Sequence, residues 1–219
     1  MRGIMAALAI AGLAAPVGAQ HTGHAAPAGA PTETRLPAGW QMRIDPGRNP
    51  APVSLMSMGE GFHIETGRGS GVFWHPRYTA RGNYEVRATF AQQNAPEGLR
   101  EAYGVILGGT DMQAEGHRYL YFLVRGTNEY MIRHRAGNEL HTIAEWTAHP
   151  TVRPLDAGKT TNELVVRVAA DSVHFVVNGT QVAAYGRAAM MDTEGQVGLR
   201  ANHRLDLQVP RFEVVPQTR

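Results

Sequence analysis

The sequence predicts an all-β fold, a two-sheet antiparallel jelly-roll sandwich of about twelve strands. Apolar and polar residues alternate along most of the chain, as in residues 84–90, and period two is the spacing of a half-buried strand. Asn178-Gly179 stands between two β-rich runs, which is the signature of a two-residue hairpin turn. Beyond the first nineteen residues, every long window with apolar groups at helical spacing is interrupted by glycine or proline.

Composition is consistent with one such domain and excludes several kinds of chemistry. A chain of 219 residues suits a single sandwich. Its 21 Lys and Arg nearly balance its 19 Asp and Glu, and the arginines are scattered, which argues against nucleic acid as a partner. Cysteine is absent, so thiolate catalysis and Cys-ligated zinc are excluded.

The N-terminus predicts export. Arg2 precedes an apolar run over residues 4–15, and Val17-Gly18-Ala19 supplies the small residues that signal peptidase requires. We therefore expect residues 1–19 to be a signal peptide, with the mature protein periplasmic or secreted. The apolar run is too short to span a bilayer, so no transmembrane segment is expected after cleavage. Residues 20–38 are rich in Ala, Pro and Gly and predict a disordered leader, followed by the β-sandwich domain over 39–216.

Strands are expected in order along this domain, separated by short polar or glycine-containing turns. Residues 43–52 contain three prolines and predict a loop, and glycine-rich residues 67–71 predict a turn because no helix follows them. Apolar alternation changes parity beyond Pro210, which predicts a bulge or a bend there and places Pro210 outside any central strand. The expected strands are 62–66, 72–74, 84–90, 103–107, 119–125, 130–134, 142–146, 164–168, 173–177, 181–185, 196–201 and 205–209, the last resuming at 212–214 beyond Pro210.

The order of these patterns resembles the concanavalin A-like lectin/glucanase superfamily. The likeness covers residues 40–215 and is strongest to the laminin-G-like and sugar-hydrolase-associated jelly rolls of exported bacterial proteins. It implies the sandwich fold, but the matching motifs are structural and a shared fold does not transfer a function. Those motifs are residues 82–90, 119–125 with the hairpin to 130–132, 162–168, 175–179, 195–199 and 212–214.

Motifs for catalysis are missing from the sequence. Glucan-cleaving relatives carry Glu-x-Asp-x-x-Glu on one strand, and this chain has no such triplet and no His-Glu-x-x-His. We assign no catalytic residue, no metal ligand and no cofactor. A structural calcium stays open, because oxygen ligands leave little pattern in a sequence and Asp111 suits a ligand or a turn equally. A glycoside hydrolase or lyase with carboxylates from separate strands, such as Glu85 with Glu129 or Glu145, is the alternative.

The pattern in residues 119–125 predicts a binding surface. If Leu120, Phe122 and Val124 fill the core, Tyr119 and Tyr121 lie on the outer face of their sheet. Exposed aromatic and arginine side chains together mark interaction sites, although the reversed parity, with the tyrosines in the core, stays open. The residues assigned to this ligand-binding surface are Tyr119, Tyr121, Arg133, Arg87 and Trp146.

Taken together, the sequence predicts an exported protein that binds carbohydrate or a cell-envelope glycan without cleaving it. Beside the hydrolase or lyase, a protein-interaction module is the second alternative. The ligand and the oligomeric state stay open.

Overall fold

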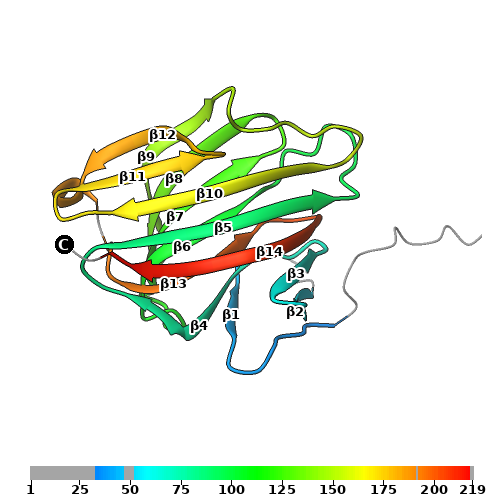
Figure 1. Cartoon of the computed structure of the whole chain (residues 1–219). Coiled ribbons are helices and arrows are strands. Elements are labelled where there is room, and N and C mark those ends of the chain that lie inside the picture. The colour runs from blue at the N-terminus through cyan, green and yellow to red at the C-terminus, as the bar shows by residue number, and fades with distance from the viewer. Residues whose placement is uncertain (1–32, 47–51, 191, 218–219) are drawn as a thin grey trace, which may run out of the picture.

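The computed structural model describes residues 33–46, 52–190 and 192–217. They form fourteen strands and one 3₁₀ turn, η1 (Arg187–Ala189), arranged as two stacked antiparallel sheets of seven strands each (Figure 1). The predicted all-β sandwich is therefore confirmed. The expected signal peptide, and the expected leader up to residue 32, lie outside the described residues.

One sheet, called sheet 1 below, has the strand order β1-β4-β13-β6-β7-β8-β9. The other, sheet 2, has the order β12-β11-β10-β5-β14-β3-β2. The strands of sheet 1 are β1 (Gln41–Ile44), β4 (Gly71–Ala80), β13 (Gly195–Ala201), β6 (Ala102–Thr110), β7 (Arg118–Arg125), β8 (Glu129–Ala136) and β9 (Glu139–Ala148). Those of sheet 2 are β12 (Thr180–Gly186), β11 (Ser172–Val177), β10 (Thr160–Val168), β5 (Tyr84–Gln93), β14 (Leu205–Pro216), β3 (Gly61–Thr66) and β2 (Val53–Met58).

Two of the fourteen strands, β1 and β2, were not predicted. β1 pairs with β4, Arg43 opposite Val72, although Arg43 falls in the expected loop. β2 pairs with β3 and buries Val53 and Leu55 completely. Arg35, assigned to the leader, forms a bridge to β2, because its carbonyl accepts the N–H of Leu55 at 2.9 Å. Short runs of this kind become strands by pairing with an existing edge, which a local pattern does not reveal.

The core lies between the sheets and follows the predicted parity. Leu120, Phe122 and Val124 of β7 are 0% exposed and belong to the cluster that fills the interior, together with the inward residues of β5. Phe122 of sheet 1 meets Phe175 of sheet 2 edge-on, with their ring centroids 5.2 Å apart. This contact joins the two layers directly, so the predicted inward set of β7 is confirmed.

The predicted hairpin turn is confirmed as well. Asn178 and Gly179 have φ values of 48° and 83° and connect β11 to β12. Positive φ at both central positions is the geometry of a type I′ turn.

Pro210 was placed partly wrongly by the sequence. The pairing of β14 with β5 shifts register between Gln208 and Arg211, which confirms the bulge. Pro210 nevertheless lies within β14, and β14 is a central strand between β5 and β3. The strand tolerates it because pairing with β3 ends at Val209 opposite Phe62, while the bulge skips the residue on the β5 side. No ladder bond therefore needs the N–H that proline lacks.

Candidate ligand-binding face

The side of sheet 1 that faces away from the core, called the sheet-1 face below, holds most of the predicted site. Register pairs Tyr121 with Ile106 on one side and with Arg133 on the other, while Tyr119 lies opposite Arg135. Directly opposed residues of antiparallel strands point to the same side, so these side chains share one face. The predicted outward orientation of the two tyrosines is therefore correct.

Exposure of those tyrosines differs from the prediction. Tyr119 is 0% and Tyr121 4% exposed, so neither ring is an open platform. They belong to a second apolar cluster, on the outer side of the sheet, with Trp146 packed against it. The buried members of this outer cluster are Val72, Trp74, Ala102, Ile106, Met112, Tyr119, Tyr121, Leu123 and Met131.

The connection between β6 and β7, residues 111–117, reaches across this face. Its carbonyl at Ala114 accepts a hydrogen bond from Nη1 of Arg43 on β1, at 3.1 Å. Met112 packs in the outer cluster, and the ring of His117 lies 5.9 Å from that of Tyr119. This loop therefore covers the part of the outer cluster next to Tyr119, and strand periodicity carries no information about such cover.

Arginines pack over the aromatic side chains. The guanidinium of Arg200 lies 5.4 Å from the ring centre of Tyr121 and donates to the Tyr119 hydroxyl at 3.2 Å. It also pairs with Asp45. Burial raises the pKa of Asp45, but the charge of Arg200 and its hydrogen bonds outweigh burial and lower this pKa below its ordinary value.

A second arginine, Arg125, packs against Trp146. Its guanidinium lies 4.0 Å from the indole centre, a cation–π distance. The same group holds Glu129 through two hydrogen bonds of 2.7 and 2.8 Å. These bonds, with one from Thr127, lower the pKa of Glu129 to about 2. The half-buried indole of Trp146 is therefore partly covered by the Arg125–Glu129 ion pair.

Arg133 carries the only charged side chain among the predicted site residues of the sheet-1 face. Its side chain is 25% exposed and pairs with Glu145 on β9, Nη2 to Oε2 at 3.2 Å. Its buried Nε has no hydrogen-bond partner among the described residues. Tyr119, Tyr121, Arg133 and Trp146 thus share the sheet-1 face.

Arg87 does not lie with them. It projects from β5 in sheet 2, where it bonds Glu85 at 2.7 Å and Glu163 at 3.1 Å. These contacts belong to a ladder of half-buried ion pairs on the opposite side of the sandwich. Alternation within β5 predicted correctly that Arg87 points away from the core. It could not predict that β5 belongs to sheet 2, on the other side of the molecule.

The described part of the sheet-1 face carries a groove of about 600 Å³ that sequence reasoning missed. Trp74 of β4 lies in its wall, and its rim carries side-chain amides, hydroxyls and the exposed guanidinium of Arg81. Gln196 lines the groove as well, and its Oε1 atom, which is shielded from solvent, has no hydrogen-bond donor among the described residues. The residues lining the groove are Gln41, Trp74, Thr79, Arg81, Gly109, Thr110, Asp111, Met112, Gln113, Ala114, Gly195 and Gln196.

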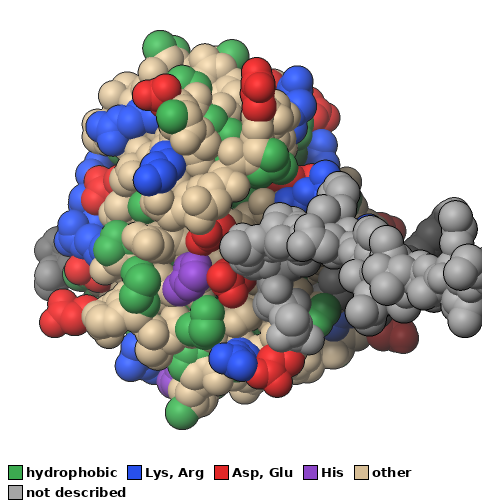
Figure 2. Space-filling view, turned by 90° about the vertical axis from the view of Figure 1, so that its right-hand side faces the viewer, with side chains coloured by type: hydrophobic (Ala, Val, Ile, Leu, Met, Phe, Trp, Pro, Cys, Tyr) green, Lys and Arg blue, Asp and Glu red, His purple; other side chains and the backbone are tan. Residues whose placement is uncertain are grey.

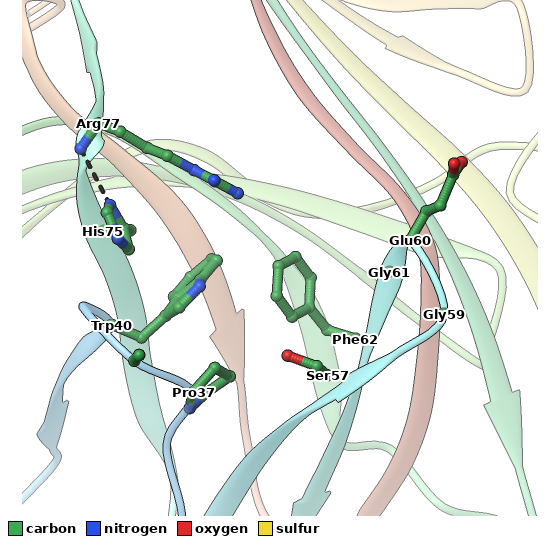
Figure 3. Close-up of a pocket in the computed structure, with 10 residues that line it drawn as sticks. Pro37, Trp40, Ser57, Gly59, Glu60, Gly61, Phe62, His75 and Arg77 are labelled. Carbon is green, nitrogen blue, oxygen red and sulfur yellow. Dashed lines mark hydrogen bonds between the residues drawn. The ribbon is translucent and has the colours of Figure 1, made fainter.

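A second hollow, of about 330 Å³, lies where β1 approaches the β2–β3 hairpin (Figure 3). Trp40 and Phe62 face one another across it, and the guanidinium of Arg77 extends above them. The two rings are packed edge to face, with centroids 4.7 Å apart, and both belong to the core. Arg77 is already bound to the Tyr78 hydroxyl at 2.6 Å. The two aromatic rings that line this hollow therefore pack on one another and close this end of the core.

The carboxylates proposed for a hydrolase are not assembled. Glu85 lies on sheet 2, whereas Glu129 and Glu145 lie on sheet 1. Burial raises the pKa of Glu85, but hydrogen bonds from Arg167 and Arg87 outweigh it and leave the pKa lowered. A glycosidase needs two facing carboxyls, one of them with a raised pKa, so neither pairing of Glu85 fits that chemistry.

Within the described ranges, no group of three or more His, Asp or Glu side chains is placed to hold a metal ion. Asp111 has a φ of 51°, and its carbonyl accepts the N–H of Ala114 at 2.7 Å. It therefore makes a turn, while a calcium role for it stays a prediction. Among the same residues, no helix is long and apolar enough to cross a membrane.

Comparison with known proteins gives a match in structure alone. No family model matches the sequence, and no curated protein matches it. The carbohydrate-binding module CBM66 from Bacillus subtilis is similar over 84% of this chain and 99% of its own, at 11% identity and a TM-score of 0.58.

Two further structures show the same likeness. A Bacillus subtilis protein of unknown function with a galectin-like fold gives 15% identity and a TM-score of 0.58, over 82% of this chain and 90% of its own. The exoplasmic domain of VIP36, solved with calcium and mannose, gives 8% identity and a TM-score of 0.56, over 83% and 84%. At such identities the likeness concerns the fold, and this chain is a β-sandwich of the concanavalin A-like fold.

Proposed function

We propose that the chain is an exported protein that binds a glycan on the sheet-1 face without cleaving it. The observation that carries the proposal is the groove beside Trp74, whose rim combines side-chain amides and hydroxyls with the exposed guanidinium of Arg81. Sugar hydroxyls both donate and accept, as the amides and hydroxyls of this rim require.

The solved structures support the same class of ligand. CBM66 is by its name a carbohydrate-binding module, and the VIP36 domain was solved with mannose bound. Each shares the sandwich fold with this chain over more than four fifths of its length. The fold is thus one that binds sugars in other proteins.

Binding without cleavage fits the carboxylates of this face. The pKa values of Asp45 and Glu129 are both lowered, because each is held by an arginine. Such groups stay ionised at neutral pH and are unsuited to protonate a leaving sugar.

Binding is tested with a glycan array, using the mature protein with and without calcium. Gln41→Ala and Arg81→Ala remove exposed polar side chains from the groove and are expected to weaken binding at least about tenfold, or 1.4 kcal/mol. Gln208→Ala and Arg68→Ala remove the same side chains from exposed positions elsewhere and are the matched controls.

Each other outcome favours a named alternative. A protein that binds no glycan on the array would support the protein-interaction module. Release of shorter sugars from a bound glycan would support the hydrolase or lyase. Equal losses in groove variants and controls would place the site elsewhere.

Export is tested by mass spectrometry of the protein from the periplasm and the medium. The expected mature N-terminus is Gln20, after loss of residues 1–19. An intact N-terminus on protein recovered from the cytoplasm would contradict export.

A further inference from the structure

The two outer faces of the sandwich differ in charge, although the chain as a whole is nearly neutral. Among the outward strand residues of sheet 1 and the adjoining Asp45, five arginines stand against three carboxylates: Arg43, Arg125, Arg133, Arg135 and Arg200 against Asp45, Glu129 and Glu145. On sheet 2 the balance is reversed, with Arg87, Arg167 and Arg211 against Glu65, Glu85, Glu163, Asp206 and Glu213. At the end of the sandwich that Figure 2 shows, basic and acidic side chains are interspersed. The outward strand residues of sheet 1 are therefore richer in arginine than in carboxylate, and those of sheet 2 are the reverse.

Each carboxylate of the sheet-1 face already has an arginine. Asp45 pairs with Arg200, Glu129 with Arg125, and Glu145 with Arg133. In the described structure, no carboxylate lies within 4.0 Å of Arg43 or Arg135. Instead, Arg43 donates to the Ala114 carbonyl at 3.1 Å, and Arg135 donates to the Gly137 carbonyl at 3.2 Å. The covering loop adds Asp111 and Glu115, but these side chains are exposed and pair with none of the five arginines.

The guanidinium groups are also incompletely satisfied. The buried Nε atoms of Arg133, Arg135 and Arg200 have no partner among the described residues, and Arg200 is only 7% exposed. Each guanidinium keeps an acceptor at one Nη atom or more, but its buried Nε has lost hydration that nothing among the described residues replaces. An anion that reaches the exposed part of Arg133 or Arg135 therefore gains more here than at a solvated arginine.

The pKa of His117, which lies beside Tyr119, is affected by the positive charge of Arg43 and Arg135. Burial lowers the pKa of His117, and the charges of Arg43 and Arg135 lower it further, against two backbone carbonyls that raise it. The potential around Tyr119 is thus positive enough to disfavour a further cation.

We propose that the sheet-1 face binds acidic glycans, with Arg133 and Arg135 of β8 recognising a carboxylate or sulfate on the sugar. The proposal rests on the proposed glycan binding and names the class of glycan. These two arginines are two positions apart on β8 and therefore lie side by side on the same face. Arg133 is opposite Tyr121, and Arg135 is opposite Tyr119. Arginine is suited to the task because its planar fork matches a carboxylate or sulfate with two hydrogen bonds.

The test compares two probes of the same shape. Oligogalacturonate carries a carboxylate on every sugar, and its methyl ester carries none. The mature protein is expected to bind the acid at least about tenfold more tightly than the ester, or 1.4 kcal/mol, by calorimetry at low salt. Because exposed charges are screened by salt, this preference should shrink when ionic strength rises to about 0.5 M. Sulfated dextran fragments, run beside them, tell sulfate from carboxylate as the preferred anion.

Variants locate the effect. Arg133→Gln and Arg135→Gln are expected to reduce the preference for the acid about tenfold or more. Arg167→Gln, on the sheet-2 face, is the matched control and should leave it unchanged. Circular dichroism of each variant confirms that it folds, and Arg133→Lys, which keeps the charge but not the fork, is expected to recover part of the preference.

The outcomes separate the two proposals. Equal binding of acid and ester, or a preference that survives in both arginine variants, would overturn acidic recognition and leave glycan binding intact. If neither these probes nor any glycan of the array binds, the proposed function fails and this inference fails with it.

Discussion

Tyr121 lies on the outer side of sheet 1 with 4% of its surface exposed, beneath the guanidinium of Arg200. Replacing it with Ala is expected to cost about 3 kcal/mol or more of unfolding free energy, as truncation of a buried aromatic does. Chemical denaturation measures this loss. Tyr121→Phe is the control and should cost under about 1 kcal/mol, because the ring and its packing remain. A small loss for the alanine variant would mean that the ring is exposed in solution after all.

Glu129 provides a second test at the scale of one residue. Hydrogen bonds from Arg125 and Thr127 lower its pKa from 4.5 to about 2 in the folded protein. The stabilisation from its charged form is therefore complete above the unfolded pKa and is lost as pH falls through the folded pKa. The stability difference between the protein and Glu129→Gln should be constant above pH 5 or so and should shrink as pH falls toward 2. A difference that does not change between pH 6 and pH 2.5 would show that Glu129 is not held in this way.

The β11–β12 hairpin is the element whose turn the sequence specifies most directly. Gly179 has a φ of 83°, and an added Cβ would meet no atom within 4 Å, so backbone strain alone opposes a side chain there. Gly179→Val is expected to lower the unfolding free energy by more than about 1 kcal/mol. Gly186→Val, at the end of β12, is the matched control, because its backbone is outside the left-handed region. Equal denaturation midpoints for the two variants would contradict the turn assignment.

At the scale of the whole molecule, one core joins both sheets, and it contains members of nearly every strand. Unfolding is therefore expected to be a single cooperative transition. Far-UV circular dichroism reports the sheets, while the fluorescence of Trp40, Trp74 and Trp146 reports the end of the core and the outer cluster. The two signals should give the same midpoint. An earlier fluorescence transition would show that the outer cluster opens separately from the sandwich.

Prediction from the sequence succeeded where a local pattern has one structural meaning. Twelve strands were expected, and β3 to β14 lie at those places, because alternation over five or more residues reports a half-buried strand. β1 and β2 were missed, since the stability of each comes from pairing with a neighbour distant in sequence. Of the predicted site residues, four share one face, but Arg87 is separated from them by the thickness of the sandwich.

What the sequence determined by itself is which residues point inward and where the chain must turn. The side-chain period and the positive φ of Asn178-Gly179 depend only on residues that are neighbours in the sequence, so the sequence alone can reveal them. Which strands share a sheet, which loop covers an outer face, and how arginines and carboxylates divide between the two faces depend on pairings between distant segments. Only the tertiary structure decides these, and for that reason the strands of a near-neutral chain present more arginine than carboxylate on the outer side of sheet 1 and the reverse on sheet 2.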